Sequence, residues 1–311
     1  MFVLRGIAVS LAFFVLLYSV LSMLVLGTWR RLMLLRSTVG RRADLLFWLR
    51  IIPLAASAAV TLALVVPSYV RLEPRSIDED IAMPLALGLG CLLLLGLGLF
   101  RVIAAQRESA RIVTGWMAGA DALDVGVSAP LFRTRRQAPP LTLVGVCSPS
   151  IVVSESTVAR LTADELRVAV QHEVAHMRSR DNLKKLVFHC SPFFGMGPLE
   201  HAWQEAAELA ADDRAVSSIG EALDLAAALI KLSRIFPTSA VPAFTMALVN
   251  GAGSVSLRVE RLLAWNENRA RHAPVASIYL VPLGSIALLA AIACYGPALA
   301  CIHTMSEWLV R

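Results

Sequence analysis

Four long apolar stretches dominate the hydropathy pattern, and each is long enough to cross a bilayer, which takes about 20 apolar residues. Three lie near the N-terminus, and the fourth follows a long polar segment. They predict membrane-spanning helices at about residues 6–28, 51–70 and 81–100 and within 273–311. The first stretch exceeds the roughly 7–15 apolar residues of a signal peptide and precedes no clear cleavage site. We therefore expect a retained span.

The segment between the third and fourth spans, residues 107–272, predicts a separate, mainly helical α+β domain. Two short runs rich in β-branched residues, 141–146 and 150–154, predict two strands or a hairpin. Thr162 and Glu165 form a capping-box pattern, which predicts a helix from Ala163 that continues past Asp181 towards Leu186.

Two further segments of the inserted domain belong to the same prediction. The alanine-rich residues 198–216 have strong helical propensity. The aromatic and basic segment 183–199 fits either a position at the membrane surface or a core loop between two helices. The fold expected is thus an α-helical membrane protein with four transmembrane helices, 1–106 holding the first three, and an inserted domain at 107–272.

Composition and charge support this layout. Hydrophobic residues make up 57% of the chain and charged residues 17%, below the roughly 25% of soluble domains. Arginines cluster between the first two spans and on both flanks of the inserted domain, whereas the loop between spans two and three is acidic. Basic loops stay in the cytoplasm, so the inserted domain should be cytoplasmic and both termini outside. Because the net charge of +6 comes largely from arginines that flank spans, nucleic acid is not an expected partner.

The predicted helix from Ala163 carries the clearest chemical pattern, His172-Glu173-x-x-His176. Residues four apart share one face of a helix, so the two imidazoles can hold one ion. Glu173 lies about 100° round the helix, where it can reach a bound water but not the same metal. This pattern is typical of zinc sites in which the glutamate acts as a general base.

A catalytic zinc usually has three protein ligands and one open position. The downstream candidates for the third ligand are His189, Glu200, His201, Glu205 and Glu208. Glu208 and Asp212 stand four apart in the helix predicted over 198–216. Such a pair suits one carboxylate on the metal and a second that orients a ligating histidine. From spacing alone, Glu205 remains the second choice, and an ordinary solvated acidic face remains an alternative for the pair.

"HEVAHMRSRD" followed by "ELAADDRAV" resembles the BlaR/MecR-type family of integral membrane zinc metallopeptidases. The resemblance implies a zincin-like domain, with three spans before it and one after it. It also implies one zinc ion held by His172, His176 and Glu208, with Glu173 as general base and Asp212 behind the ligands. "SLRVERLL" at 256–263 resembles a further family segment without an assigned role. No S-x-x-K motif lies on the outer side, so antibiotic sensing is not expected.

The expected function is that of a membrane-embedded zinc endopeptidase of a bacterial inner membrane, cutting a protein or peptide at the cytoplasmic face in regulatory signalling. The alternative is an inactive zinc-binding scaffold. Candidate contacts to the substrate or transition state are His201, Arg178 and Arg180, and an edge strand within 141–154 is expected to bind the substrate backbone. Membrane lipid is an expected partner, and a homo-oligomer is compatible with the pattern.

Overall fold

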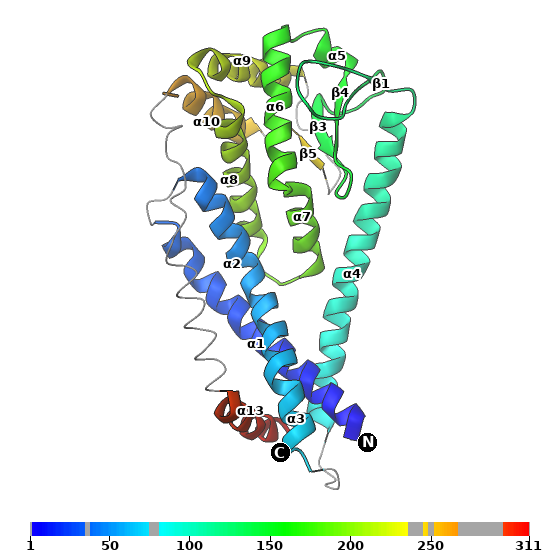
Figure 1. Ribbon diagram of the computed structural model, residues 1–311, viewed down its shortest axis with the longest axis vertical. Coiled ribbons are helices and arrows are strands. Elements are labelled where there is room, and N and C mark those ends of the chain that lie inside the picture. The colour runs from blue at the N-terminus through cyan, green and yellow to red at the C-terminus, as the bar shows by residue number, and fades with distance from the viewer. Residues whose placement is uncertain are drawn as a thin grey trace.

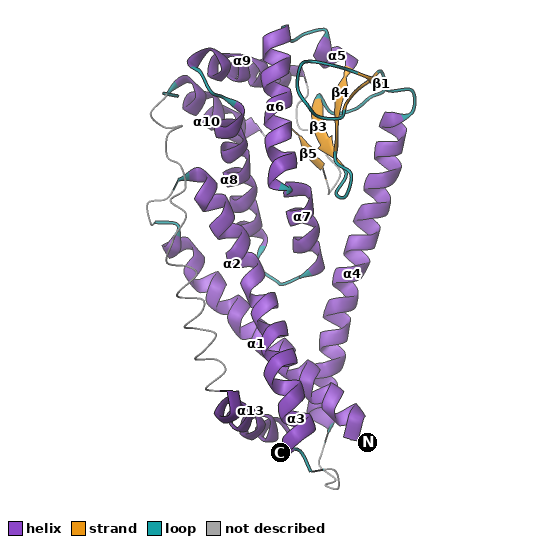
Figure 2. Cartoon of the chain, viewed as in Figure 1, coloured by secondary structure: helices purple, strands orange, loops and turns teal. Residues whose placement is uncertain are grey.

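The computed structural model describes residues 2–34, 38–74, 81–235, 245–247, 252–266 and 295–310. Three long helices run through the molecule: α1 (Phe2–Leu32), α2 (Val39–Val60) and α4 (Ala82–Met117). They converge at one end, where both chain termini lie, and spread apart towards the other end, where α6 (Ala163–Ser179), α7 (Asp181–Cys190), α8 (Gly197–Ala215) and the sheet lie between α2 and α4 (Figure 1). Helices make up most of the described chain (Figure 2).

The long helices are apolar enough to cross a membrane. The candidate spans are Phe2–Leu32, Val39–Leu72 and Ala82–Met117. The second of these joins α2 to a π-helix, η1 (Thr61–Val65), and to α3 (Val66–Leu72). Large apolar side chains such as Leu93 and Phe100 point outwards, an arrangement that suits lipid. The first three predicted segments are thus helices long and apolar enough to cross a membrane, as predicted. In the predicted fourth segment, residues 273–294 lie outside the described residues, and α13 (Tyr295–Val310) follows them.

Helix α4 links the membrane helices to the inserted domain without a break. The predicted boundary at 106/107 lies inside this helix, which ends at Met117. Trp116, in its last turn, packs with Val144 and Val152 of the sheet. The inserted domain is therefore fixed directly to a membrane helix.

The sheet has five strands in the order β1-β2-β4-β3-β5. Their bounds are β1 (Asp121–Ala122), β2 (Leu131–Thr134), β3 (Leu141–Val144), β4 (Ser150–Ser154) and β5 (Thr245–Ala247). β3 and β4 pair antiparallel, as the predicted hairpin requires, whereas β2 and β4 are parallel. The prediction of an edge strand within 141–154 is wrong, because β5 pairs with the free side of β3. The edges are β1 and β5.

Six helices complete the described part of the inserted domain, with α6 at its centre. They are α5 (Glu155–Val158), α6 (Ala163–Ser179), α7 (Asp181–Cys190), α8 (Gly197–Ala215), α9 (Ile219–Ile235) and α10 (Ala252–Leu263). Val170 and Val174 of α6 pack in one core with Leu143 and Ile151 of the sheet and Leu229 of α9. This core fixes α6 between the sheet and α9.

Helix α6 starts where the capping box predicts and ends earlier than predicted. Both hydrogen bonds between Thr162 and Glu165 are present. The prediction of one helix to Leu186 is wrong: Arg180 adopts a left-handed conformation with φ 54°, and α7 begins at Asp181. Asn182 Nδ2 then donates to the carbonyl oxygens of Leu143 and Gly145, which ties α7 to β3.

A second core joins α8 and α7 to α2. Trp203 of α8 and Phe188 of α7 pack with Leu46 of α2. Arg50 of α2 is buried and donates to Glu200 of α8 at 2.7 Å. Of the segment 183–199, Phe188, Met196 and Leu199 lie in this core, whereas Phe194 is 93% exposed. α8 is held both by a membrane helix and by the inserted domain.

Candidate metal centre

His172 and His176 lie one turn apart on α6 and face the same point. Both rings are buried, and their Nε2 atoms are 3.1 Å apart with ring planes at 80°. The i,i+4 spacing stacks the side chains on one helix face. The burial of two polar rings with converging nitrogen atoms is what a shared ion requires.

Helix α8 supplies a carboxylate to the same point. Glu208 Oε2 lies 3.4 Å from His172 Nε2, and Glu208 Oε1 lies 3.7 Å from His176 Nε2. Candidate ligand atoms of the three residues all lie within 4.8 Å of one another. With zinc–ligand bonds of 2.0–2.1 Å, neighbouring ligands of a tetrahedral ion stand about 3.3 Å apart. The two Nε2 atoms and one carboxylate oxygen of Glu208 are therefore spaced as the ligands of one ion of this size.

The hydrogen bonding of Glu208 also fits a bound ion. Both Glu208 oxygens are buried, and neither accepts an aligned hydrogen bond from the residues that the structure describes, although Arg258 Nη1 lies 3.0 Å from Oε2. A buried carboxylate without aligned hydrogen bonds is costly, and a bound cation would satisfy it. His172, His176 and Glu208 are thus a buried group that could bind a metal ion.

Two aspartates orient the imidazole rings from behind. Asp212 Oδ1, one turn after Glu208 on α8, lies 2.9 Å from His172 Nδ1. Asp181 Oδ2 lies 2.7 Å from His176 Nδ1. A carboxylate on Nδ1 favours the tautomer that leaves Nε2 free to bind a metal.

The break in the helix at Arg180 is what brings Asp181 to His176. In a continuous helix, a residue five positions on would lie about 140° round the axis from His176. The left-handed residue instead turns the chain so that the carboxylate reaches the ring. Sequence reasoning placed Asp181 only in the trailing part of the motif and missed this contact.

Arg258 of α10 completes the group, and sequence reasoning missed it. The buried guanidinium forms two hydrogen bonds to Asp212, at 2.7 and 2.8 Å, and its Nη1 lies 3.0 Å from Glu208 Oε2. The only signal was the segment 256–263, which contains this arginine. Arg258 therefore fixes both carboxylates of α8 in one orientation.

Electrostatics keep the two α8 carboxylates charged. Burial disfavours the charged form of both carboxylates, but the positive charge of Arg258 outweighs the effect of burial. It lowers the pKa of Asp212 to about 2 and the pKa of Glu208 well below its usual range. Burial also opposes protonation of His176, but Glu208 and Asp181 raise its pKa to about 10. A proton and a metal ion therefore compete for this ring.

Glu173 differs from the other carboxylates of the site. It is fully buried, and neither oxygen accepts an aligned hydrogen bond within the described part of the chain. Burial raises its pKa to about 7, although His172 and His176 pull in the opposite direction. A carboxyl group with a pKa near neutrality can both accept and return a proton.

Three of the predicted substrate contacts lie on the surface. His201 is two turns before Glu208, its side chain is 71% exposed, and it lies 3.5 Å from Glu205. Arg178 and Arg180 are also exposed. The structure does not bring His201 or Glu205 into the buried group.

Lys185 is a cation near the group that sequence reasoning did not place there. It follows Asp181 by one turn of α7. Burial lowers the pKa of Lys185, and the charges of Glu208, Asp181 and Glu173 oppose that shift.

The chain matches no known protein-family model, and no curated protein is significantly similar to it. Its class therefore follows from the fold and the site alone. The chain is a mainly helical protein with three helices that suit a membrane, a small mixed sheet and a buried His–His–Glu group that could bind a metal ion.

Proposed function

We propose that the protein is a membrane-embedded zinc endopeptidase. The observation that carries the proposal is the convergence of His172, His176 and Glu208 beside Glu173, a buried carboxylate without an aligned hydrogen bond. Two imidazoles and one carboxylate are the ligand set of catalytic zinc sites with one open position. A structural zinc site normally has four protein ligands and needs no unpaired glutamate beside it.

Each residue of the site has its own role in peptide hydrolysis. Bound zinc would supply Lewis acidity, which polarises the scissile carbonyl and acidifies water. Glu173 takes a proton from the attacking water on its carboxylate oxygen and returns it to the leaving amine. Asp212 and Asp181 hold the two imidazole rings in place, and Arg258 holds Asp212 and Glu208.

The substrate that suits this site is a protein segment in extended conformation. β5 is the sheet edge that lies against α6 and α7. An incoming peptide would therefore pair with β5 or displace it from β3, and main-chain hydrogen bonds would align it beside α6.

The proposal extends to the family and to the topology. The helix motif, the later carboxylate pair and the three helices before the domain support a BlaR/MecR-type, zincin-like peptidase with a fourth span near the C-terminus. The arginine-rich flanks support a cytoplasmic domain in a bacterial inner membrane with both termini outside. A regulatory protein substrate and self-association complete the proposal.

Glu173→Gln tests catalysis apart from metal binding. The variant should keep zinc, because Glu173 is not in the ligand group, and should lose cleavage by about 10²–10⁴-fold, the usual contribution of a general base. His172→Ala should lose both. Glu205→Gln, on the exposed face of α8, is the matched control and should retain both.

The readout is a comparison of protein termini in cells that carry each variant. Peptide ends that appear with the parent chain and vanish with Glu173→Gln identify substrates. If Glu173→Gln leaves every terminus and phenotype unchanged while His172→Ala does not, the protein is an inactive zinc-binding scaffold and the enzyme proposal fails.

A further inference from the structure

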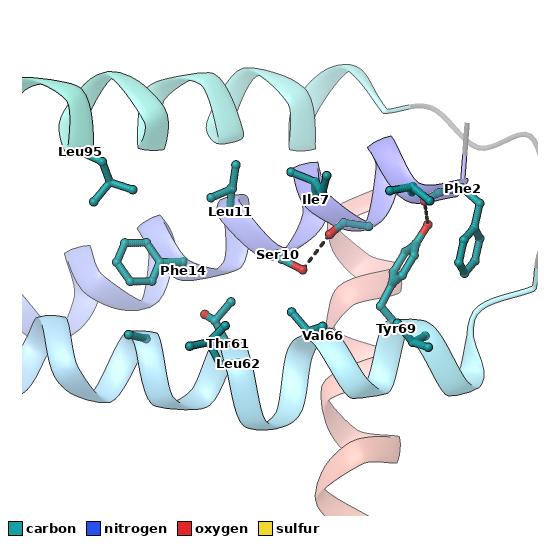
Figure 3. Close-up of a pocket in the computed structure, with 14 residues that line it drawn as sticks. Phe2, Ile7, Ser10, Leu11, Phe14, Thr61, Leu62, Val66, Tyr69 and Leu95 are labelled. Atoms are coloured by element: carbon teal, nitrogen blue, oxygen red, sulfur yellow. Dashed lines mark hydrogen bonds between the residues drawn. The ribbon is translucent and has the colours of Figure 1, made fainter.

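A cavity of about 490 Å³ lies among the membrane-spanning helices, at the end where they converge. It opens to the surface, where the lining residues Val3, Leu62 and Val70 are exposed. Figure 3 shows it between α1, α4 and the α2–η1–α3 segment, with Phe14 and Leu95 at one end and Phe2 and Tyr69 at the other. Its volume is within the range of small-ligand sites. It is far in the fold from the metal centre, since it lies near the termini (Figure 1).

The end of the cavity at Tyr69 is closed by a close approach of two helices. A Cβ atom on Gly6 would lie 2.7 Å from the Tyr69 ring, so only glycine allows α1 to pack there. The Tyr69 hydroxyl donates to the carbonyl oxygen of Phe2 and accepts from Arg5 Nε at 3.0 Å. Arg5 also pairs with Glu73. These contacts tie α1 to α3 at this end, and the charges of Arg5 and Glu73 neutralise each other.

The wall of the cavity includes a π-helix, and its first residue is Thr61. Short π-helical segments inside α-helices are frequent at functional sites. Four other hydroxyls in the candidate spans bond the carbonyl oxygen four residues back: Ser10 to Gly6, Thr28 to Leu24, Ser57 to Pro53 and Thr114 to Ala110.

Three buried hydroxyls in the candidate spans depart from this pattern, those of Ser22, Ser109 and Thr61, and Thr61 is the one of them that lines the cavity. Its Oγ1 has no hydrogen-bond partner among the described residues, although its side chain is only 7% exposed. Figure 3 shows the side chain pointing from the π-helix towards α1, into the space beside Phe14. In an apolar surrounding, an unpaired hydroxyl is costly. A ligand that brings an oxygen to this point would satisfy it.

The uncharged lining of the cavity indicates that the ligand is uncharged. None of the described residues that line the cavity is charged, and apart from Thr61, Ser10 and the Tyr69 hydroxyl the lining is apolar. A carboxylate or phosphate placed inside would lack a counter-charge and would be strongly disfavoured. An apolar chain with one uncharged hydroxyl or ester group fits both the walls and Thr61.

We propose that this cavity is a binding site for an uncharged single-chain lipid, of the monoacylglycerol kind, whose hydroxyl or ester oxygen accepts a hydrogen bond from Thr61. The chain lies along α1 between Phe14 and Tyr69. The proposal goes beyond the peptidase function and does not depend on it, because no residue of the metal centre takes part.

The test uses the purified full-length chain in phosphatidylcholine nanodiscs with a trace of a diazirine-bearing monoacylglycerol. Light-induced labelling should fall in α1 and in residues 58–70. Unlabelled monooleoylglycerol should compete, and oleate should compete at least about tenfold less well, because its carboxylate meets an uncharged lining.

Two variants examine the cavity itself. Thr61→Val removes the hydroxyl at nearly constant shape and should weaken labelling about fivefold, the loss expected for one hydrogen bond. Ser10→Phe fills the space and should abolish labelling. Thr28→Val, whose hydroxyl bonds only its own helix, is the matched control and should not differ from the parent chain. Size-exclusion profiles show whether each variant stays folded.

Three results would overturn the proposal. The first is labelling spread evenly over the lipid-facing residues and unchanged in Ser10→Phe. The second is equal competition by oleate. The third comes from a photoreactive residue at Leu62: capture of residues 267–294 of the chain, in place of lipid, would show that the protein fills its own cavity.

Discussion

Arg258→Met is the perturbation that most severely tests the architecture of the candidate metal centre. The guanidinium is buried and contacts two buried carboxylates, Asp212 at 2.7 Å and Glu208 at 3.0 Å. Methionine has a similar reach and no charge. The substitution therefore leaves two negative groups without this counter-charge while changing the packing little.

The expected loss of stability follows from those contacts. At an effective dielectric constant of about 20, unit charges about 4 Å apart attract by about 4 kcal/mol. Desolvation of the arginine offsets part of this in the parent chain, and removing one partner of a buried pair costs about 3–5 kcal/mol. We expect R258M to lower the free energy of unfolding by that amount.

Arg261→Met is the matched control on the same helix. Arg261 pairs with Asp213 of α8, but the two side chains are 23% and 38% exposed. Exposed pairs contribute about 0–1 kcal/mol. The R261M variant should therefore unfold close to the parent chain.

The assay is denaturant unfolding of the purified chain in detergent, followed by the fluorescence of the buried Trp203 and Trp265. Added zinc should recover part of the loss in R258M, because the ion supplies positive charge to Glu208 but does not restore the contact to Asp212. Equal effects of R258M and R261M would refute the reasoning, since they would mean that the carboxylates do not depend on Arg258.

Two further predictions concern α6. Asp181→Asn should weaken zinc affinity by about 10–100-fold, because His176 loses its charged partner. Competition with a chelator measures the affinity, and Asp164→Asn, at an exposed position, is the control. Equal zinc affinities of the two variants would contradict the prediction. Thr162→Ala should cost about 1 kcal/mol of stability through loss of the N-cap. Denaturant unfolding measures this against Thr114→Ala, an exposed position in the last turn of α4, and an equal loss in both would contradict the capping role.

Local patterns in the sequence account for much of the fold. The capping box at Thr162 and Glu165 sets the start of α6, and the β-branched runs give β3 and β4. The i,i+4 spacing of His172 and His176 predicts one shared helix face, as the structure has it. These features depend on contacts within one element or on helical periodicity, which a sequence displays directly. Glu208 lies on another helix, and the family resemblance, not spacing alone, singled it out among the downstream acids.

The features that could not be predicted depend on distant contacts. The left-handed Arg180 ends α6 where the periodic pattern continues, because the contact of Asp181 with His176 requires the turn. Arg258 reaches Asp212 from 46 positions away, and β5 covers β3 from about 100 positions away. Nothing in the local sequence around these residues marks the partner.

The most direct test of the central claim is the X-ray absorption spectrum and zinc content of the purified full-length chain. The account predicts one zinc ion per chain, bound by two imidazole nitrogens and carboxylate oxygen at about 2.0–2.2 Å with no sulfur, and loss of the ion in Glu208→Ala. A sulfur ligand, or zinc content unchanged in Glu208→Ala, would contradict the claim that His172, His176 and Glu208 form the metal site.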